Sequence, residues 1–559
     1  MTIEETMQII ASFVWLLAGV GVFIVGMNFL GDALEKGAGE GMKSLLGKIT
    51  NNRLSGVGIG AGVTAIIQSS SATTVMVIGL VNAGAMTLLQ AAAIVMGANI
   101  GTTVTGLLVA LKNDYFNMVM YLTAFIGVML GFAKKEKVKF IGKLCTGLGM
   151  IFIGLNVMSS DEAFGNPLME ELFIKVFQSI DFPPLLILIG ALFTALIQSS
   201  SAATGVVITM VGTGVMPLDL ALFIILGANI GTCVTALLAS VGANVNAKRV
   251  ACIHFAFNVI GSVLFAAVIW IFKEQAVGVL TAIFPGDDVM SVQMRVSVFH
   301  VIFNVVTTCL LLPFINELVK LSCLIVKDKP SKESALSLKF VDERLIATPA
   351  IAMAQSKKEI DYMMDLVRGN ILRSFETLEN GTTDNYDAIE DDEAKIDFIN
   401  NALTKYLIKL SNVVEEHDEK LIGSYFHVLN DLERMGDHAE NFYDIGAEMK
   451  EKNLQFSPVA REEVAKMRGA VVEMFDIAKE AFETLNKTNL PALTALENQV
   501  DEMKKVLTAR HFERLKEGIC SVELVPYYTS IVTRLERVAD HIVNVGYSIV
   551  SPTGSEKVV

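Results

Sequence analysis

Two identical polar tetrads interrupt apolar stretches of the chain. Gln68-Ser69-Ser70-Ser71 recurs as Gln198-Ser199-Ser200-Ser201, and we call the step from Gln68 to Gln198 the repeat offset. Each tetrad offers one amide and three hydroxyls, and hydroxyls both donate and accept hydrogen bonds. At the end of a helix, free backbone N–H groups and the positive end of the helix dipole would add to these groups. The pair therefore predicts a cradle for a tetrahedral oxyanion that carries its own proton.

A second duplicated motif follows each tetrad at the same distance along the chain. Residues 97–102 and 227–232 both read Gly-Ala-Asn-Ile-Gly-Thr. Amide and hydroxyl oxygens suit a hard cation such as sodium, by extension of the logic for calcium. Few charges interrupt the apolar stretches, so a bound cation would offset the anion's charge. The cation would also gain roughly 2.3 kcal/mol per 100 mV when it crosses with the field.

Packing is the alternative explanation for both motifs. Small residues four apart, as at Gly97/Gly101 and Gly227/Gly231, let helices approach closely in a membrane. The glycine motif can serve both purposes. Two four-residue polar clusters are too costly in lipid to be packing devices alone, which favours binding for the tetrads.

A third motif, Arg-Val-x-x-x-His-x-x-Phe-Asn, occurs twice, starting at Arg249 and at Arg295. It places His254 with Asn258 and His300 with Asn304, each pair one helical turn apart on one face. Such pairs can relay protons or gate a path. They can equally form interhelical hydrogen bonds, and the sequence leaves both roles open.

The elements that carry these motifs are apolar stretches long enough to cross a membrane. The chain has 559 residues, 52% of them hydrophobic, and a mean hydropathy of +0.51, which is high for a soluble protein of this size. Runs of about 20 apolar residues, the length that spans a bilayer core, recur up to residue 330 and not beyond it. The first run follows an acidic start without a cleavage pattern, so we interpret it as a span and not a signal peptide. Gly26-Met27-Asn28, echoed by Gly154-Leu155-Asn156, extends the duplication toward the N-terminus.

Charge placement predicts how the two copies lie in the membrane. Lysine- and arginine-bearing segments at 36–53, 134–143, 248–249 and 320–332 should face the cytoplasm, and the acidic segment 159–182 should lie outside. These placements agree if each tetrad lies in a re-entrant hairpin. Repeat one then has three spans, at about 9–30, 86–111 and 116–133, and this odd number inverts repeat two. Inverted repeats with broken elements that meet at the midplane are a common transporter design.

The region after residue 340 is polar, amphipathic and also duplicated. Residues 432–438 and 535–541 share the pattern Leu-Glu-Arg-x-x-Asp-His, and each is preceded in the sequence by another acidic pair. We expect two similar three-helix bundles. Paired carboxylates on one helix face repel each other unless a cation bridges them. The candidate metal ligands are Glu393, Asp397, Glu433, Asp437, Glu497, Asp501, Glu536 and Asp540. The alternative for the acidic pairs is a solvated helix face with salt bridges to Arg434 and Arg537. His438 and His541 either join a metal site or lie on the surface.

Composition and missing motifs exclude several other functions. The formal net charge of −14, without a dominant basic patch, argues against a nucleic-acid partner. The six cysteines lack CxxC spacing, so we interpret them as reduced thiols. There is no P-loop, nucleophile elbow or zincin motif, and the serines have no base beside them. We therefore expect that the protein is not an enzyme.

The duplicated tetrads and glycine motifs resemble those of the type II sodium/phosphate cotransporter family, over roughly residues 10–325. The resemblance implies an all-α, polytopic membrane protein of two inverted repeats with re-entrant hairpins. It implies phosphate binding at Gln68, Ser69, Ser70, Ser71, Gln198, Ser199, Ser200 and Ser201. It implies sodium binding at Ser71, Thr73, Asn99, Thr102, Ser201, Thr204, Asn229 and Thr232. The first tetrad continues Ala-Thr-Thr and the second Ala-Ala-Thr, so the ion sites need not be symmetric.

The C-terminal region resembles the PhoU family of phosphate-signalling proteins, some of which bind metal clusters at such acidic motifs. Together the resemblances imply sodium-coupled phosphate import across the plasma membrane, or cell inner membrane, by alternating access. A divalent or transition metal in the cytoplasmic C-terminal domain, a homodimer and phosphate-signalling partners remain open hypotheses. The alternatives are a phosphate-responsive membrane signalling protein and a sodium-coupled transporter of another oxyanion.

These expectations divide the chain into four parts. Residues 1–326 form the membrane domain, with repeat one at about 9–133, repeat two at about 138–242 and further spans within 250–320. Residues 327–339 form a linker. Residues 340–550 form the PhoU-like domain, and 551–559 form a tail.

Overall fold

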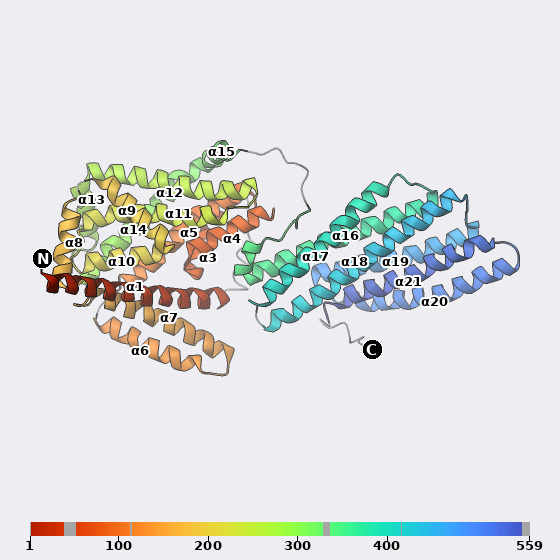
Figure 1. Cartoon of the computed structure of the whole chain (residues 1–559), viewed down its shortest axis with the longest axis horizontal. Coiled ribbons are helices and arrows are strands. Elements are labelled where there is room, and N and C mark those ends of the chain that lie inside the picture. The colour runs from red at the N-terminus through yellow and green to blue at the C-terminus, as the bar shows by residue number, and fades with distance from the viewer. Residues whose placement is uncertain are drawn as a thin grey trace. The chain divides into compact units, whose positions relative to one another are not determined.

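The computed structural model describes residues 2–37, 52–111, 114–180, 182–327, 336–414 and 416–550. Within these ranges the chain is all-helical, as the sequence predicts, and contains no strand. Contacts divide it into two units, Met1–Pro330 and Ser331–Val559, whose helices Figure 1 labels. Residues 38–51 of the first basic segment, 328–335 of the expected linker and 551–559 of the expected tail lie outside the described residues.

The first unit carries the apolar helices. They are α1 (Ile3–Gly37), α3 (Arg53–Ile67), α4 (Ser70–Asn82), α5 (Leu88–Val109), α6 (Asp114–Gly131), α7 (Glu136–Ser159), α8 (Pro167–Gln178), α9 (Pro183–Ile197), α10 (Ser200–Gly212), α11 (Leu218–Ala239), α12 (Val245–Ile271), α13 (Lys273–Ile283), α14 (Val289–Leu311) and α15 (Ile315–Ile325). Helices α3, α4 and α5 have the same lengths as α9, α10 and α11, and their ends are related by the repeat offset. The duplication is thus a duplication of structure.

Six helical stretches of the described chain are long and apolar enough to cross a membrane. They are Ile3–Leu34, Leu88–Val109, Glu136–Ser159, Leu218–Ala239, Val245–Ile271 and Val289–Ile325. Helices α3, α4, α9 and α10 are apolar but shorter. With 15 residues, α3 is only about 22 Å long, which is less than a bilayer core.

Each tetrad breaks the chain between two of these short helices. Gln68 ends α3 and Gln198 ends α9, both in the left-handed region with φ of 60° and 57°. Residues other than glycine rarely adopt this left-handed backbone conformation. Strained backbone conformations of this kind are concentrated at functional sites. The next serine is the N-cap of α4 or α10, so one helix ends where the other begins.

Helices α1 and α7, which begin the two copies, pack through glycines. A Cβ on Gly19 would lie 3.1 Å from the carbonyl oxygen of Gly154, and a Cβ on Gly26 would lie 2.9 Å from that of Gly147. The lower number on α1 meets the higher number on α7, so the two helices run antiparallel. When Gly26 is aligned with Gly154 as the sequence repeat requires, Gly19 is equivalent to Gly147. These contacts are therefore reciprocal.

The second unit consists of two groups of three helices. The first group is α16 (Pro349–Asn380), α17 (Tyr386–Ser411) and α18 (Glu416–Glu451), and the second is α19 (Pro458–Thr484), α20 (Leu490–Lys516) and α21 (Val525–Tyr547). Each group packs as a bundle around buried aromatic and aliphatic side chains, such as Phe375 and Phe442 in the first and Phe482 and Tyr528 in the second. Helices α16 with α19, and α18 with α21, join the bundles.

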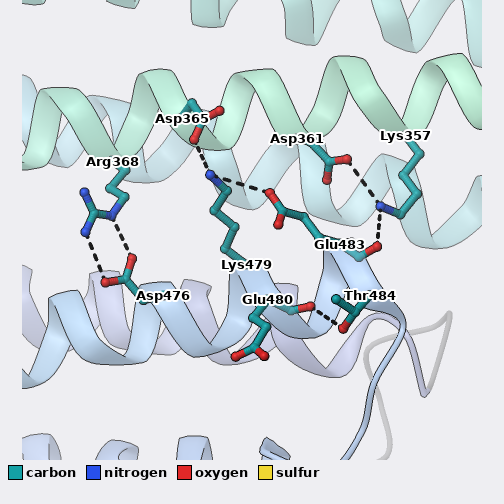
Figure 2. A network of polar contacts seen from close by, with 9 residues as sticks. All are labelled: Lys357, Asp361, Asp365, Arg368, Asp476, Lys479, Glu480, Glu483 and Thr484. Carbon is teal, nitrogen blue, oxygen red and sulfur yellow. Dashed lines mark hydrogen bonds and ion pairs between the residues drawn. The ribbon is translucent and has the colours of Figure 1, made fainter.

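Opposite charges line the contact between α16 and α19 (Figure 2). Arg368 donates to both carboxylate oxygens of Asp476, at 2.7 and 3.0 Å, and Lys479 pairs with Asp365. Lys357 donates to the carbonyl oxygen of Glu483 at 3.1 Å. Partly exposed pairs of this kind contribute little energy each, so the packing of α16 against α19 depends mainly on their buried apolar side chains.

A buried carboxylate fastens the chain that enters the first bundle. Glu359 of α16 is fully buried and accepts hydrogen bonds from the backbone N–H groups of Lys339 and Phe340, at 3.0 and 2.6 Å. Burial raises the pKa of Glu359, and the two N–H donors act in the opposite direction. The ammonium of Lys339 lies 4.3 Å from the centre of the Tyr362 ring. The start of the second unit is therefore held by specific contacts.

Candidate functional site

Each tetrad places its first serine as a helix cap and its second at the start of the helix. Ser69 accepts a hydrogen bond from the N–H of Ala72 at 3.1 Å, and Ser199 accepts one from Ala202 at 3.2 Å. Ser70 and Ser200 begin α4 and α10 and are 4% and 6% exposed. The first backbone N–H groups of a helix lack intrahelical partners, so the start of α4 and the start of α10 each present N–H donors next to a serine pair. Anion binding at these two breaks stays a prediction.

The two tetrads meet through two threonines. Thr105 of α5 donates to Oε1 of Gln68 at 2.7 Å and lies 3.4 Å from Oγ of Ser201. Thr235 of α11, its equivalent at the repeat offset, lies 3.1 Å from Oγ of Ser71. Each copy thus reaches the tetrad of the other. Among the predicted phosphate ligands, Gln68 of one copy and Ser201 of the other are thus joined through Thr105, and Ser71 contacts Thr235.

The two glutamines of the tetrads differ in their surroundings. Gln68 is half-buried, and its Nε2 donates to the carbonyl oxygen of Ala65 at 2.5 Å. Gln198 is exposed. The first glutamine is therefore fixed by protein contacts at both ends of its amide, and the second presents its side chain outward.

The glycine motifs allow close helix packing, as the packing alternative requires. A Cβ on Gly97 would lie 2.0 Å from the carbonyl oxygen of Val57, and one on Gly227 would lie 2.0 Å from that of Ile187. These contacts press α5 against α3 and α11 against α9. The glycines thus hold the broken helices in place, whatever else the motif does.

The polar residues of the same motifs are buried and keep acceptor capacity. Thr102 donates to the carbonyl oxygen of Ala98 at 3.1 Å, and Thr232 donates to that of Ala228 at 3.0 Å. A hydroxyl that gives its hydrogen to its own helix leaves its lone pairs for a cation. The amide nitrogen of Asn99 and the hydroxyl of Thr204 have no hydrogen-bond partner in the described chain.

The helix pair α3/α4 has a hydrogen bond between its two helices that α9/α10 lacks in the described chain. Thr64 of α3 donates to Thr73 of α4 at 2.9 Å, and Thr73 donates to the carbonyl oxygen of Ser69 at 3.0 Å. In the second copy Ala203 replaces Thr73, and the hydroxyl of the buried Thr194 has no hydrogen-bond partner among described residues. The hydroxyl of Thr73 thus has two protein contacts and one remaining lone pair, and its predicted role as a sodium ligand stays a prediction.

The arginine–histidine–asparagine motif lies on α12 and α14. Nε of Arg249 donates to the carbonyl oxygen of Val326, the C-cap of α15, at 3.1 Å, and Nε of Arg295 donates to that of Phe284, the C-cap of α13, at 3.0 Å. Asn258 donates to the carbonyl oxygen of His254 at 3.0 Å. Asn304 donates to that of His300 at 2.9 Å. The predicted one-turn pairing is thus present, and it uses the histidine backbone and not the ring.

The first acidic cluster of the second unit surrounds Glu393. Both carboxylate oxygens of Glu393 are buried without a hydrogen-bond partner in the described chain. Burial raises the pKa of Glu393 to about 8, and the negative charges of Asp397, Asp437, Glu440 and Glu433 add to the shift. The cluster therefore favours either a proton on Glu393 or a bound cation.

The second acidic cluster is tighter and already has a cation nearby. Oxygen atoms of Asp501, Glu536 and Asp540 lie within 4.8 Å of one another, the only such group found in the described chain. The ammonium of Lys504 lies 2.9 Å from Oε1 of Glu536. Among the described residues, this cluster therefore forms its ion pair with Lys504. The alternative of a solvated acidic face expects a salt bridge to Arg537 instead.

The two histidines of the repeated motif contact each other between the bundles. The ring centres of His438 and His541 lie 6.1 Å apart. Nδ1 of His541 lies 2.8 Å from Asp431, whereas Nδ1 of His438 lies 3.3 Å from Arg534. Burial, followed by the charge of Arg534, lowers the pKa of His438 to about 4. These contacts place both rings at the junction of α18 and α21.

Thr105 and Thr235 are the site residues that sequence reasoning missed. Thr105 lies one helical turn after Thr102, the threonine that ends the first glycine motif. Thr235 lies at the equivalent position after Thr232, as the repeat offset requires. Extending the repeat comparison by one helical turn would have identified them. Their contact with the opposite tetrad requires the packed structure.

Comparison with known proteins identifies the family of the membrane unit. The sequence model of the Na+/Pi-cotransporter family matches residues 22–160 and 171–291, which contain both tetrads. The protein YqeW of Bacillus subtilis, named as uncharacterized, is 31% identical over 328 residues, which cover 58% of this chain and all of YqeW. The chain belongs to the Na+/Pi-cotransporter family. This is a family of membrane transporters and not of enzymes, as the sequence predicts.

The second unit matches the PhoU domain at residues 360–445 and 464–549, one match in each bundle. The Escherichia coli K12 protein named "Putative inorganic phosphate export protein YjbB" is 23% identical over 543 residues, 96% of both chains. The mouse "Sodium-dependent phosphate transport protein 2C" is 41% identical over 103 residues, which are 16% of this chain and 17% of that protein. Phosphate transport is the function common to these two names.

Proposed function

We propose that this protein imports inorganic phosphate across the plasma membrane, coupled to sodium, by alternating access. The observation that carries the proposal is the pair of crossed contacts at the tetrads. Gln68 is linked through Thr105 to Ser201, and Ser71 contacts Thr235. These contacts link Ser71 at the start of α4 and Ser201 at the start of α10 to the opposite copy, and serine hydroxyls at helix N-termini can hold an oxyanion.

Sodium coupling follows from the neutrality of this region. The acceptor oxygens of Thr102 and Thr232 and the amides of Asn99 and Asn229 lie on α5 and α11, the helices whose Thr105 and Thr235 contact the tetrads. No acidic or basic side chain occurs between residues 54 and 111 or between 183 and 218 of the sequence. A phosphate anion brought here needs cations to offset its charge, and each coupled sodium ion also adds driving force.

The inverted orientation of the two copies is part of the proposal. Its support is the antiparallel, reciprocal contact of α1 with α7 through equivalent glycines. When two equivalent helices run antiparallel, the two-fold axis that relates them is perpendicular to both helices. If α1 and α7 span the membrane, this axis therefore lies in the membrane plane. The short helices that meet at each tetrad then form re-entrant hairpins that enter from opposite sides.

The proposal is tested in proteoliposomes with labelled phosphate and a sodium gradient. We expect accumulation that depends on sodium, and we expect Ser70→Ala with Ser200→Ala to abolish it while the protein still folds. Ser322→Ala is the matched control, because Ser322 is a fully buried serine of the same unit that donates to its own helix. Uptake by the double variant at the unmodified rate would refute the site assignment. Competition by sulfate or arsenate would point to another oxyanion.

Export is a second candidate, because the name of the E. coli relative specifies that direction. Intact cells distinguish the two directions. Cells that express the protein should gain phosphate in a sodium-containing medium if it imports, and lose internal phosphate if it exports. Phosphate movement that ignores an imposed sodium gradient would remove the coupling from the proposal.

We also propose that the PhoU-like unit is cytoplasmic, binds divalent cations at its acidic clusters and regulates transport. Its support is the convergence of Asp501, Glu536 and Asp540 and the unpartnered carboxylate of Glu393 in the described chain. Titration with Mn2+ or Mg2+ should stabilise the unit against heat, and Asp540→Asn with Glu393→Gln should remove that effect. Equal stabilisation of the variant would exclude these clusters as the binding sites.

A further inference from the structure

Two buried histidines occupy equivalent positions in the membrane unit. His254 of α12 and His300 of α14 are each 1% exposed. Both have an asparagine one turn later that donates to the histidine carbonyl oxygen. Their local structure is thus the same, and any difference between them arises from what each ring contacts.

The ring of His300 contacts a predicted sodium ligand. Its Nε2 lies 3.4 Å from Oδ1 of Asn229 on α11. Nδ2 of Asn229 donates to the carbonyl oxygen of Ile225 at 2.9 Å, which fixes the amide so that Oδ1 faces the ring. Because an amide oxygen can only accept, Nε2 of His300 must carry the hydrogen. Oδ1 of Asn229 keeps its second lone pair.

The corresponding residues His254 and Asn99 lack this contact in the described chain. The amide nitrogen of Asn99 has no hydrogen-bond partner there, whereas Nδ1 is unpartnered in both histidines, so the contrast lies in the contact of Nε2. Asn229 is therefore held by two hydrogen bonds, one to its own helix and one to α14. The two copies present the same asparagine with different restraint.

We propose that His300 is a positioning residue for cation binding: it fixes the Asn229 amide so that the free lone pair of Oδ1 is available to sodium. This inference rests on the proposed sodium coupling. A ligand held in its binding orientation loses less conformational freedom when the ion arrives. Without the hydrogen bond from His300 the amide can rotate, and sodium affinity falls while phosphate binding at the serines is retained.

The test compares His300→Phe with the matched variant His254→Phe in proteoliposomes. Each removes ring nitrogens from an equally buried position and keeps a planar ring. We expect the sodium KM of His300→Phe to rise about fivefold, the change that loss of one neutral hydrogen bond represents. The phosphate KM and the rate at saturating sodium should change less than twofold, and His254→Phe should resemble the unmodified protein.

His300→Gln provides the rescue, because its amide nitrogen can occupy the position of Nε2, and it should restore the sodium KM. Equal shifts in the two phenylalanine variants, or no rescue by glutamine, would overturn the inference. If His300→Phe does not fold, nitrogen NMR of the labelled unmodified protein decides the matter. An Nε2–H tautomer that responds to sodium supports the inference, and an Nδ1–H tautomer overturns it.

Failure of the inference differs from failure of the proposed function. Sodium-independent transport by the unmodified protein would refute the coupling, and this inference with it. Sodium-dependent transport with indistinguishable His300 and His254 variants would refute the inference alone.

Discussion

The two duplications in this chain are used in opposite ways. In the membrane unit, Thr105 and Thr235 each reach the tetrad of the other copy, so two repeats contribute to one polar region. In the PhoU-like unit, each bundle keeps its own acidic cluster, around Glu393 in one and around Asp501 in the other.

The two duplications also differ in how alike their copies are. Both tetrads have the same residues and a left-handed glutamine, whereas the two acidic clusters differ. Glu393 lies against Gly436, where a Cβ would come within 2.7 Å of its carboxylate, whereas Ala539 occupies the equivalent position in the second bundle. Lys504 neutralises part of the second cluster only.

The crossed threonines give the largest expected effect. Thr105→Val or Thr235→Val keeps the shape of the side chain and removes the hydroxyl that joins the copies. We expect either variant to lower phosphate transport at least about tenfold, because a misaligned site loses orientation at every ligand. Thr123→Val, on the exposed face of α6, is the control. Unchanged transport by both variants would show that the two tetrads do not act as one site.

Glu393 gives the next effect, on stability. Its folded pKa of about 8 lies above its ordinary value near 4.5, so the folded state binds more protons between these values and stability falls as pH rises from about 4.5 to about 8. Glu393→Gln should leave stability near pH 4.5 unchanged and raise it at pH 8 by roughly 1 to 2 kcal/mol, after discounting for solvent screening. Thermal unfolding in chelator at several pH values measures this. The same pH dependence in Glu393→Gln, with exposed Glu473→Gln as control, would contradict the assignment.

Thr73→Ala would make the helix break between α3 and α4 resemble the break between α9 and α10. It removes the hydrogen bond from Thr64 and leaves that buried hydroxyl without a partner, as Thr194 is now among the described residues. We expect a loss of about 1 kcal/mol in stability and little change in sodium KM. Thermal unfolding and uptake kinetics test the two parts separately. A large rise in sodium KM would instead support the role of sodium ligand that the sequence predicts for Thr73.

Lys504→Gln gives the smallest change in stability, below about 1 kcal/mol, because its pair with Glu536 is partly exposed. The variant removes a positive charge from the second cluster, so Mn2+ should bind there more tightly. Calorimetric titration measures this. Asn400 stands near the equivalent position of the first bundle, and Asn400→Gln should leave Mn2+ binding unchanged. Weaker Mn2+ binding by Lys504→Gln would show that the lysine supports the site.

Repetition made much of the fold and site predictable. Because Gln-Ser-Ser-Ser and Gly-Ala-Asn-Ile-Gly-Thr recur at one offset, the helix breaks at Gln68 and Gln198 and the packing of α5 and α11 could be expected. Side-chain partners could not be. The contact of Ser201 with Thr105 joins residues 96 positions apart, and nothing in either local sequence specifies that neighbour.

The sequence by itself determined the helical class, the membrane and PhoU-like halves and the residue types able to hold an oxyanion. These properties depend on composition and period, which act locally along the chain. Tertiary structure decided which tetrad Thr105 and Thr235 each contact. It also decided that the ring of His300, and not that of His254, contacts the asparagine of a glycine motif, and that Lys504 pairs with Glu536. Such choices depend on the packing of helices distant in sequence, where a shift of a few ångströms changes every hydrogen-bond partner.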